Sequence, residues 1–323
     1  MKEIQFLHKN KNKWQQFEDI IKSGKKIDPD KLSDLYIQVM DDLSYARTFY
    51  PRSSVVRYLN QLSSSVHSAV YSTKRESYQR IKTFWLKEVP LVFYDLRKYI
   101  FISLLIISIS VLIGAVSSAN DNQFVRLILG DAYVNMTEQN IAEGDPLAVY
   151  KDENQVGMFF GITLNNIWVT FRTFAFGVLF IFGTAYVLFV NGVMLGAFHH
   201  MFYKHGVLMD AFKTVWIHGT LEISAIVIAG AAGILLGSSF LFPGTYPRMA
   251  SFRMGAQKGA KAIAGLVPIF ILAGLLESFV TRYTEMPLFL TIFIIGSSLF
   301  FVVFYYIVYP GMLSKRKQEN GIN

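Results

Sequence analysis

Three ionisable residues that can do chemistry lie in the apolar part of the chain. His218 and Glu222 belong to the run His-Gly-Thr-Leu-Glu, and their spacing of four residues places them on one helix face. Glu277 lies in the next apolar stretch. An ionisable group inside a bilayer costs several kcal/mol unless it is paired or hydrated. We therefore expect the imidazole and both carboxylates to share one protein-lined pocket.

Three amide side chains accompany them. Asn165 and Asn166 interrupt a segment otherwise suited to lipid, and Asn191 interrupts the segment that follows. Asn side chains at membrane depth usually bond across helices and contribute about 1 kcal/mol. The predicted functional polar core therefore has six members: His218, Glu222, Glu277, Asn165, Asn166 and Asn191.

Three roles fit this core. It can be a structural lock between helices, a pathway for protons or solutes, or the centre of a metal-dependent hydrolase. For the last role, one histidine and two glutamates can ligate zinc and leave a coordination position open. The sequence has no His-Glu-x-x-His, Gly-x-Ser-x-Gly or Gly-x-Gly-Asp motif, and it has no cysteine for a thiolate site. We assign no catalytic residue and expect no cofactor, with zinc on His218, Glu222 and Glu277 as the exception.

The composition indicates a membrane protein with an all-α fold. Of 323 residues, 52% are hydrophobic and only 17% are charged, which is more apolar surface than a soluble chain of this length can bury. A bilayer core about 30 Å thick needs about 20 apolar residues in a helix. Residues 100–117, 215–237, 263–280 and 288–309 meet this requirement, and residues 156–203 are long enough for two crossings. We predict six spans, with a re-entrant hairpin at Asn191-Gly192, within 191–203, as the alternative path.

Charge predicts the orientation of these spans. Residues 74–99 hold seven Lys and Arg against three acids, whereas residues 118–155 hold two against seven. Because cytoplasmic loops carry the excess of Lys and Arg, both termini should be cytoplasmic and the 118–155 loop periplasmic. The expected location is the bacterial inner membrane, with multiple passes.

The front of the chain predicts a small helical bundle. Leu35, Val39 and Leu43 repeat at helical spacing, a second helix is expected over about 53–80, and a shorter one lies around 14–21. Residues 84–94 mix aromatic and basic side chains, which suits a junction helix on the lipid headgroups and requires no nucleic acid. The predicted division is a cytoplasmic domain over 1–99, a transmembrane domain over 100–311 that includes loop 118–155, and a basic cytoplasmic tail over 312–323.

Several motifs together resemble the stage II sporulation protein M family of bacterial membrane proteins, in its longer, non-sporulating branch. The motifs are Asn165-Asn166, Asn191-Gly192, His218-Gly219-Thr220-Leu221-Glu222, Ala273-Gly274-Leu275-Leu276-Glu277-Ser278 with Thr281, Asp42-Leu43-Ser44-Tyr45-Ala46-Arg47 and Leu59-Asn60-Gln61-Leu62.

The resemblance implies an envelope assembly factor. The family's namesake is a membrane scaffold that recruits cell-wall-degrading partners, and members in other bacteria tend to be encoded near MoxR-type ATPases and von Willebrand A-like envelope proteins. We therefore expect a non-enzymatic scaffold whose partners are membrane lipids and such envelope proteins. Small residues at Gly230, Gly233 and Gly237 suggest a homodimer. The alternative function is a transporter, a channel or an intramembrane hydrolase centred on His218, Glu222 and Glu277.

Overall fold

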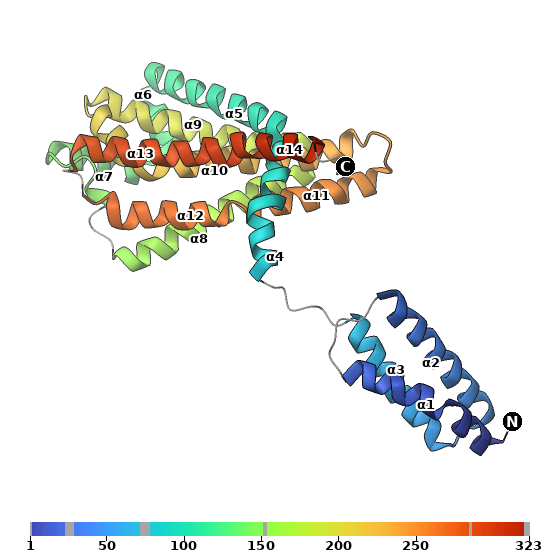
Figure 1. Cartoon of the computed structure of the whole chain (residues 1–323). Coiled ribbons are helices and arrows are strands. Elements are labelled where there is room, and N and C mark those ends of the chain that lie inside the picture. The colour runs from blue at the N-terminus through green and yellow to red at the C-terminus, as the bar shows by residue number, and fades with distance from the viewer. Residues whose placement is uncertain (1, 23–28, 72–77, 151–153, 284–285, 320–323) are drawn as a thin grey trace. The chain divides into compact units, whose positions relative to one another are not determined.

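The computed structural model describes residues 2–22, 29–71, 78–150, 154–283 and 286–319. All regular elements in these ranges are helices, which confirms the all-α prediction (Figure 1). The chain divides into two compact units, Met1–Ile81 and Lys82–Asn323.

The first unit contains α1 (Glu3–Lys22), α2 (Pro29–Phe49) and α3 (Ser54–Tyr71). The predicted stripe on α2 is buried in its core. Trp14 is also buried and donates its indole N–H to Asp42 over 2.8 Å, while Arg47 donates to Asn60 over 2.9 Å. Asp42 and Arg47 begin and end one of the quoted motifs, so this motif ties α2 to both neighbouring helices.

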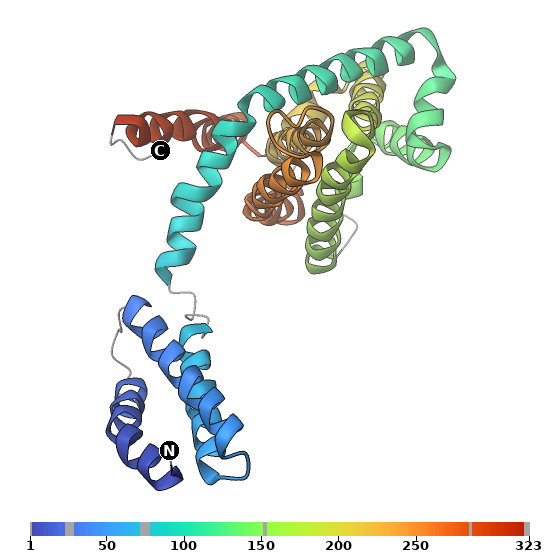
Figure 2. The same cartoon turned by 90° about the vertical axis from the view of Figure 1, so that its right-hand side faces the viewer.

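The second unit is a membrane helix bundle. Its elements are α4 (Tyr78–Thr83, which begins in the first unit), η1 (Phe84–Glu88), α5 (Val89–Asn120), α6 (Asn122–Leu129), α7 (Asp131–Ala142), η2 (Ala148–Tyr150), α8 (Gln155–Ala175), η3 (Phe176–Leu179), α9 (Phe180–Lys204), α10 (Leu208–Leu241), α11 (Arg248–Ala264), α12 (Val267–Leu275), η4 (Leu276–Val280), α13 (Leu288–Val303), η5 (Phe304–Val308) and α14 (Tyr309–Glu319). Residues 82–99 belong to this unit rather than to the first, because η1 and α5 run without a break into the first span. α10 lies centrally and packs against α5, α8, α9, α11, α12 and α13 (Figure 2).

Five helical stretches in the described ranges are long and apolar enough to cross a membrane. The longest, Gln155–Lys204, reverses its direction within its length. Thr184 donates its hydroxyl to the Thr173 carbonyl over 3.0 Å, although eleven residues of straight helix would rise about 16 Å. The reversal lies at η3 and at Phe180, whose φ is +58°. This stretch therefore supplies two antiparallel helices, α8 and α9.

The break in this stretch is not at Asn191-Gly192, where the re-entrant alternative placed it. α9 is continuous through both residues. A Cβ on Gly192 would lie 2.5 Å from the Ser110 Cβ, so this glycine lets α5 approach α9 rather than ending the helix.

The two ends of the bundle differ in composition. At one end, α6 and α7 pack on the end of α9 and the start of α10 through the buried cluster Val125, Val134, Leu147, Met201, Phe202 and Ala211. Lys204 also bonds to Asn122 over 2.8 Å at this end. Because α8 leaves this end and α9 returns to it, α8 and α9 together make an even number of crossings. The described helices thus fit the six predicted spans, with Gln155–Lys204 counted twice.

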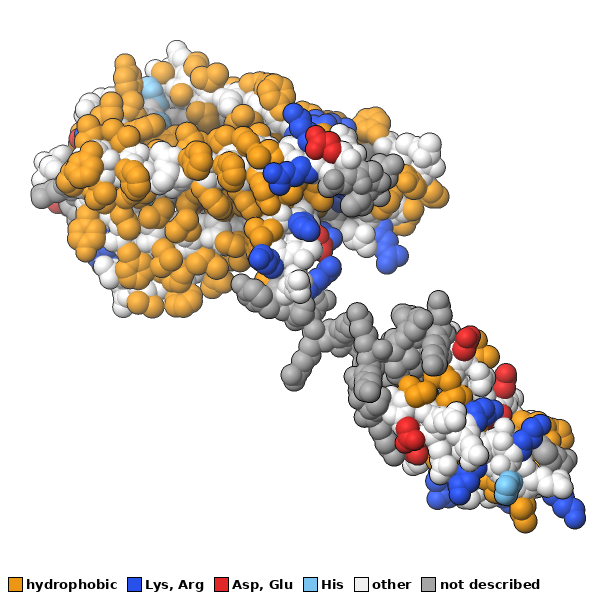
Figure 3. Space-filling model, in the orientation of Figure 1, with side chains coloured by type: hydrophobic (Ala, Val, Ile, Leu, Met, Phe, Trp, Pro, Cys, Tyr) orange, Lys and Arg blue, Asp and Glu red, His pale blue; other side chains and the backbone are white. Residues whose placement is uncertain are grey.

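The other end is basic. Lys258 pairs with Asp95 over 2.6 Å and Lys261 with Glu88 over 2.8 Å, so α11 is held to the start of α5. Figure 3 shows apolar side chains over the visible helices of the bundle and charged ones near α11 and α14. The segments rich in Lys and Arg were predicted to share one side of the membrane. They therefore lie together at one end of the bundle.

Three glycines of α10 lie against other helices of the same chain. A Cβ on Gly230 would overlap Ser103 and Leu188, one on Gly233 would overlap Thr184, and one on Gly237 would overlap the backbone at Phe180. The small-residue face that suggested a homodimer is thus covered by the chain's own helices. It no longer supports a second copy as a partner.

Candidate functional site

The central helix α10 carries two of the ionisable side chains. His218 and Glu222 lie one turn apart near the end of α10 that contacts α6 and α7. His218 is 3% exposed and Glu222 is partly buried. Since α10 is the most buried of the five stretches, its buried polar side chains must find partners within the protein.

A π-helical turn presents the third ionisable side chain. In η4 the Thr281 N–H donates to the Leu276 carbonyl, five residues back, over 2.9 Å. π-turns are rare in proteins, and many of those that occur lie at functional sites. This turn brings both Glu277 and Thr281 against His218 on α10.

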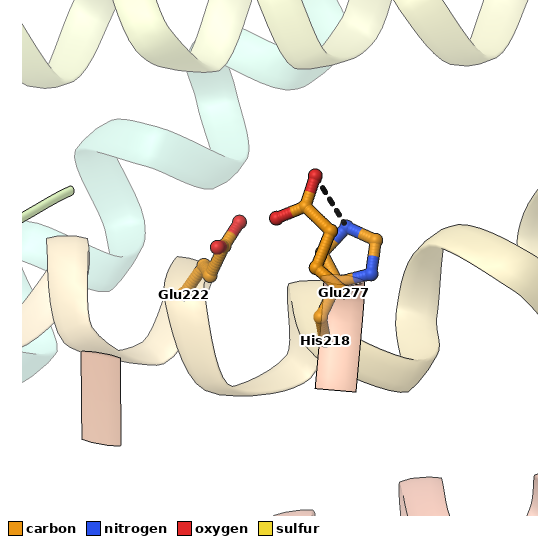
Figure 4. A group of neighbouring side chains, drawn as sticks. All are labelled: His218, Glu222 and Glu277. Carbon is orange, nitrogen blue, oxygen red and sulfur yellow. Dashed lines mark ion pairs between the residues drawn. The ribbon is translucent and has the colours of Figure 1, made fainter. Parts of the chain in front are cut away.

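The Thr281 hydroxyl links the imidazole of His218 to the Leu276 carbonyl. The Thr281 hydroxyl donates to the Leu276 carbonyl over 3.1 Å and lies 3.1 Å from His218 Nδ1. A hydroxyl has a single proton to give, so Nδ1 is the donor to Thr281 in the tautomer in which that proton goes to the Leu276 carbonyl. The other ring nitrogen, Nε2, lies 3.8 Å from Glu277 Oε1 (Figure 4).

The two carboxyl groups lie beside each other. Glu222 and Glu277 are close enough to share a hydrogen bond, and Asn166 on α8 donates to Glu222 Oε1 over 2.5 Å. One ligand atom each of His218, Glu222 and Glu277 lies within 4.8 Å of the other two. Figure 4 shows the Glu222 and Glu277 side chains pointing toward one another from different helices.

Three buried hydroxyls lie on the elements that carry Asn166 and Glu277. Thr163, Thr170 and Ser278 have side-chain oxygens with no hydrogen-bond partner among the described residues. Thr163 and Thr170 lie one turn on either side of Asn166 on α8, and Ser278 follows Glu277. Sequence reasoning missed the two threonines on α8. The signal for them was polar residues at helical spacing around Asn166 in an otherwise apolar helix.

The structure brings four of the six predicted residues together: His218, Glu222, Glu277 and Asn166. Asn165 is exposed. Asn191 donates to the Val187 carbonyl of its own helix over 2.8 Å and does not contact the group. Thr281 joins as the partner of His218. Sequence reasoning had noted Thr281 in a motif without giving it a role.

This arrangement can act in three ways. It links α8, α10 and η4, it can hold a proton between two carboxyls, and it offers one imidazole nitrogen and two carboxylates to a cation. His218 Nε2 lies within ion-pair distance of Glu277, and both partners carry charge only when the imidazole is protonated.

Two family models match separate parts of the chain. A family model described as stage II sporulation protein M matches residues 103–282, more than half of the chain and all six predicted core residues. A second model, described as a domain of unknown function (DUF8413), matches residues 4–72, which include α1 apart from Glu3 and all of α2 and α3. Comparisons with curated proteins and with solved structures gave no match.

Proposed function

Because the chain belongs to the stage II sporulation protein M family of membrane proteins, we propose that it is a scaffold or assembly component of a bacterial cell-envelope complex. The observation that carries this proposal is that one chain contains two separate compact units. A membrane bundle anchors it, and the first unit has a buried core of its own. We expect such a unit to fold without the bundle, and we propose its surface as the docking surface for partner proteins.

The proposed orientation follows from the two ends of the bundle. The end formed by η1, the start of α5 and α11 is rich in Lys and Arg and belongs on the cytoplasmic side. The end formed by α6 and α7 is acidic and belongs in the periplasm. Both termini are then cytoplasmic, and the membrane is the inner one.

The absence of cysteine permits a direct test of orientation. Single cysteines replace the exposed residues Ala142, in α7, and Gln257, in α11. We expect a membrane-impermeant maleimide to label Ala142→Cys in intact spheroplasts and Gln257→Cys only after permeabilisation. The reverse pattern would invert the proposed topology.

A crosslinking experiment tests the scaffold function itself. Full-length chain and a form lacking residues 1–72 are expressed at matched levels in the native membrane, crosslinked and purified under denaturing conditions. We expect both forms to remain in the membrane, and only the full chain to retain envelope partners such as a MoxR-type ATPase or a von Willebrand A-like protein. Equal partner recovery from both forms would remove the docking role of the first unit.

A transporter or an intramembrane hydrolase is the second candidate, favoured by the meeting of His218, Glu222 and Glu277 at one place. His218→Ala and Glu222→Gln separate the two functions. If both variants fold and keep their partners yet abolish the cellular phenotype, chemistry or transport replaces the scaffold. If the phenotype follows partner binding alone, the scaffold stands.

A further inference from the structure

We infer that His218, Glu222 and Glu277 bind one divalent first-row transition metal ion, such as zinc. This inference goes beyond the scaffold function and does not depend on it. The ligand set of one imidazole nitrogen and two carboxylates suits ions of intermediate softness, which take both nitrogen and oxygen ligands.

The separations suit a shared ion better than direct pairing. The 3.8 Å between His218 Nε2 and Glu277 Oε1 exceeds the roughly 3.2 Å limit of a good hydrogen bond. Two ligands of one tetrahedral zinc ion, each about 2.1 Å from the metal, lie about 3.4 Å apart. Since the three ligand atoms already lie within 4.8 Å of one another, modest side-chain rotations bring them to a common ion.

The groups behind the ligands follow the pattern of metal sites. A ligating histidine usually donates its other ring N–H to a fixed acceptor, and ligating carboxylates are themselves hydrogen-bonded. In the tautomer described above, His218 donates Nδ1–H to Thr281, and Thr281 is held by the Leu276 carbonyl. Asn166 holds Glu222. Nε2, which faces Glu277, is the ring nitrogen that we assign to the metal.

The surroundings supply two further arguments. Two adjacent carboxylates in a membrane bundle are costly without positive charge, and a divalent cation balances both. Ser278 is fully buried, Thr163 is 7% exposed, and their hydroxyls have no hydrogen-bond partner among the described residues. Thr163 is one helical turn from Asn166 and Ser278 follows Glu277, so we assign these hydroxyls as candidate partners of water bound to the metal.

The test begins with the metal content of the full-length protein. The chain is expressed without a histidine tag in medium supplemented with zinc and manganese, purified in detergent without chelator, and analysed by mass spectrometry of its elements. We expect one ion per chain in the wild type, and loss of at least nine-tenths of it in His218→Ala and Glu277→Gln. His199→Ala is the matched control, because His199 lies in α9 and bonds to Trp216 instead.

Substitutions behind the ligands give a graded readout. Asn166→Ala and Thr281→Val leave all three ligands in place but remove their partners. We expect each to weaken zinc affinity about 10- to 100-fold in competition with a chelator. Asn165→Ala, the exposed neighbour, should leave affinity unchanged.

Cobalt uptake by the wild type decides the matter even if the variants do not fold. Metal-free, monodisperse protein is titrated with Co²⁺, and we expect a visible absorption band that saturates at one equivalent and is displaced by Zn²⁺. Protein that takes up no Zn²⁺, Mn²⁺ or Co²⁺ would overturn the inference and leave a proton shared between the carboxyls. Full metal retention in His218→Ala would also overturn it. Neither result bears on partner capture by the first unit.

Discussion

At the scale of single residues, two adjacent asparagines show how helix rotation decides a role. Asn165 and Asn166 have the same side chain and lie at almost the same depth, but successive residues of a helix are about 100° apart around its axis. Asn166 thereby meets Glu222, and Asn165 is exposed. The same chemical group bonds to a carboxylate at one position and is exposed at the next.

This difference gives the first prediction. Asn166→Leu removes the donor to a partly buried carboxylate, so we expect it to destabilise the bundle by about 1–3 kcal/mol. Asn165→Leu, on the exposed face, should change stability by less than about 0.5 kcal/mol. Unfolding of both variants in mixed detergent micelles measures the effect. Equal losses would show that Asn166 gains nothing from Glu222.

The sequence was sufficient to predict that His218, Glu222 and Glu277 meet. The argument needed only the cost of an isolated charge in lipid and a spacing of four residues. It was insufficient to choose between Asn165 and Asn166, because the rotation of α8 depends on what α10 and α12 present to it. Thr281 could not be assigned as the partner of His218, because a π-turn changes which residues of its helix share a face.

At the scale of helices, glycines let the backbones of α5 and α9 come into direct contact. A Cβ on Gly196 would overlap the Val111 carbonyl of α5, and one on Gly114 would overlap the Val193 carbonyl of α9. Gly192 and Gly196 have the four-residue spacing of small residues at close helix contacts in membranes. The two backbones can approach only because these side chains are absent.

The second prediction concerns this contact. Gly196→Ala forces α5 and α9 apart, and overpacking of this kind costs about 1–3 kcal/mol. Gly157→Ala on α8 is the control, because its Cβ would meet nothing within 4 Å. We expect the control to be neutral or slightly stabilising, since alanine favours a helix more than glycine does. Thermal aggregation of both variants in the same detergent compares them.

The break between α8 and α9 could not be located from the sequence. Asn-Gly often marks a turn in water, but α9 is continuous through Asn191-Gly192. In a membrane helix the same glycine serves packing, and the chain reverses instead at Phe180 in a conformation that non-glycine residues rarely adopt. Phe180 lies against Gly237 of α10, and a contact of this kind cannot be read from the sequence of one stretch alone.

At the scale of the whole molecule, the first unit has a core drawn from its own three helices. The third prediction is that residues 1–81 fold without the bundle into a helical, cooperatively unfolding domain. Trp14→Ala in this fragment removes a buried ring and its bond to Asp42, and should cost about 3–5 kcal/mol. Ile4→Ala, at a side chain 78% exposed, should cost little. Circular dichroism with urea unfolding measures both.

A fragment that remains unstructured would mean that the first unit depends on the rest of the chain. The docking role proposed for it would then lose its basis. Hydrophobic periodicity was enough to predict these helices, but their division from the bundle at Ile81 was not predicted. The aromatic and basic residues after 81 suit a membrane surface as well as they suit a helical domain.

The tight reversal at Phe180 bears on how the protein is made. α8 carries two asparagines and an arginine, so it is a poor candidate to enter lipid alone, whereas α9 is strongly apolar. Their connection is so short that a ribosome delivers both helices to the translocation machinery almost at once, and Thr184 can bond back to Thr173 as soon as they pair. We expect a nascent chain stopped after α8 to slip out of the bilayer, and one stopped after α9 to stay.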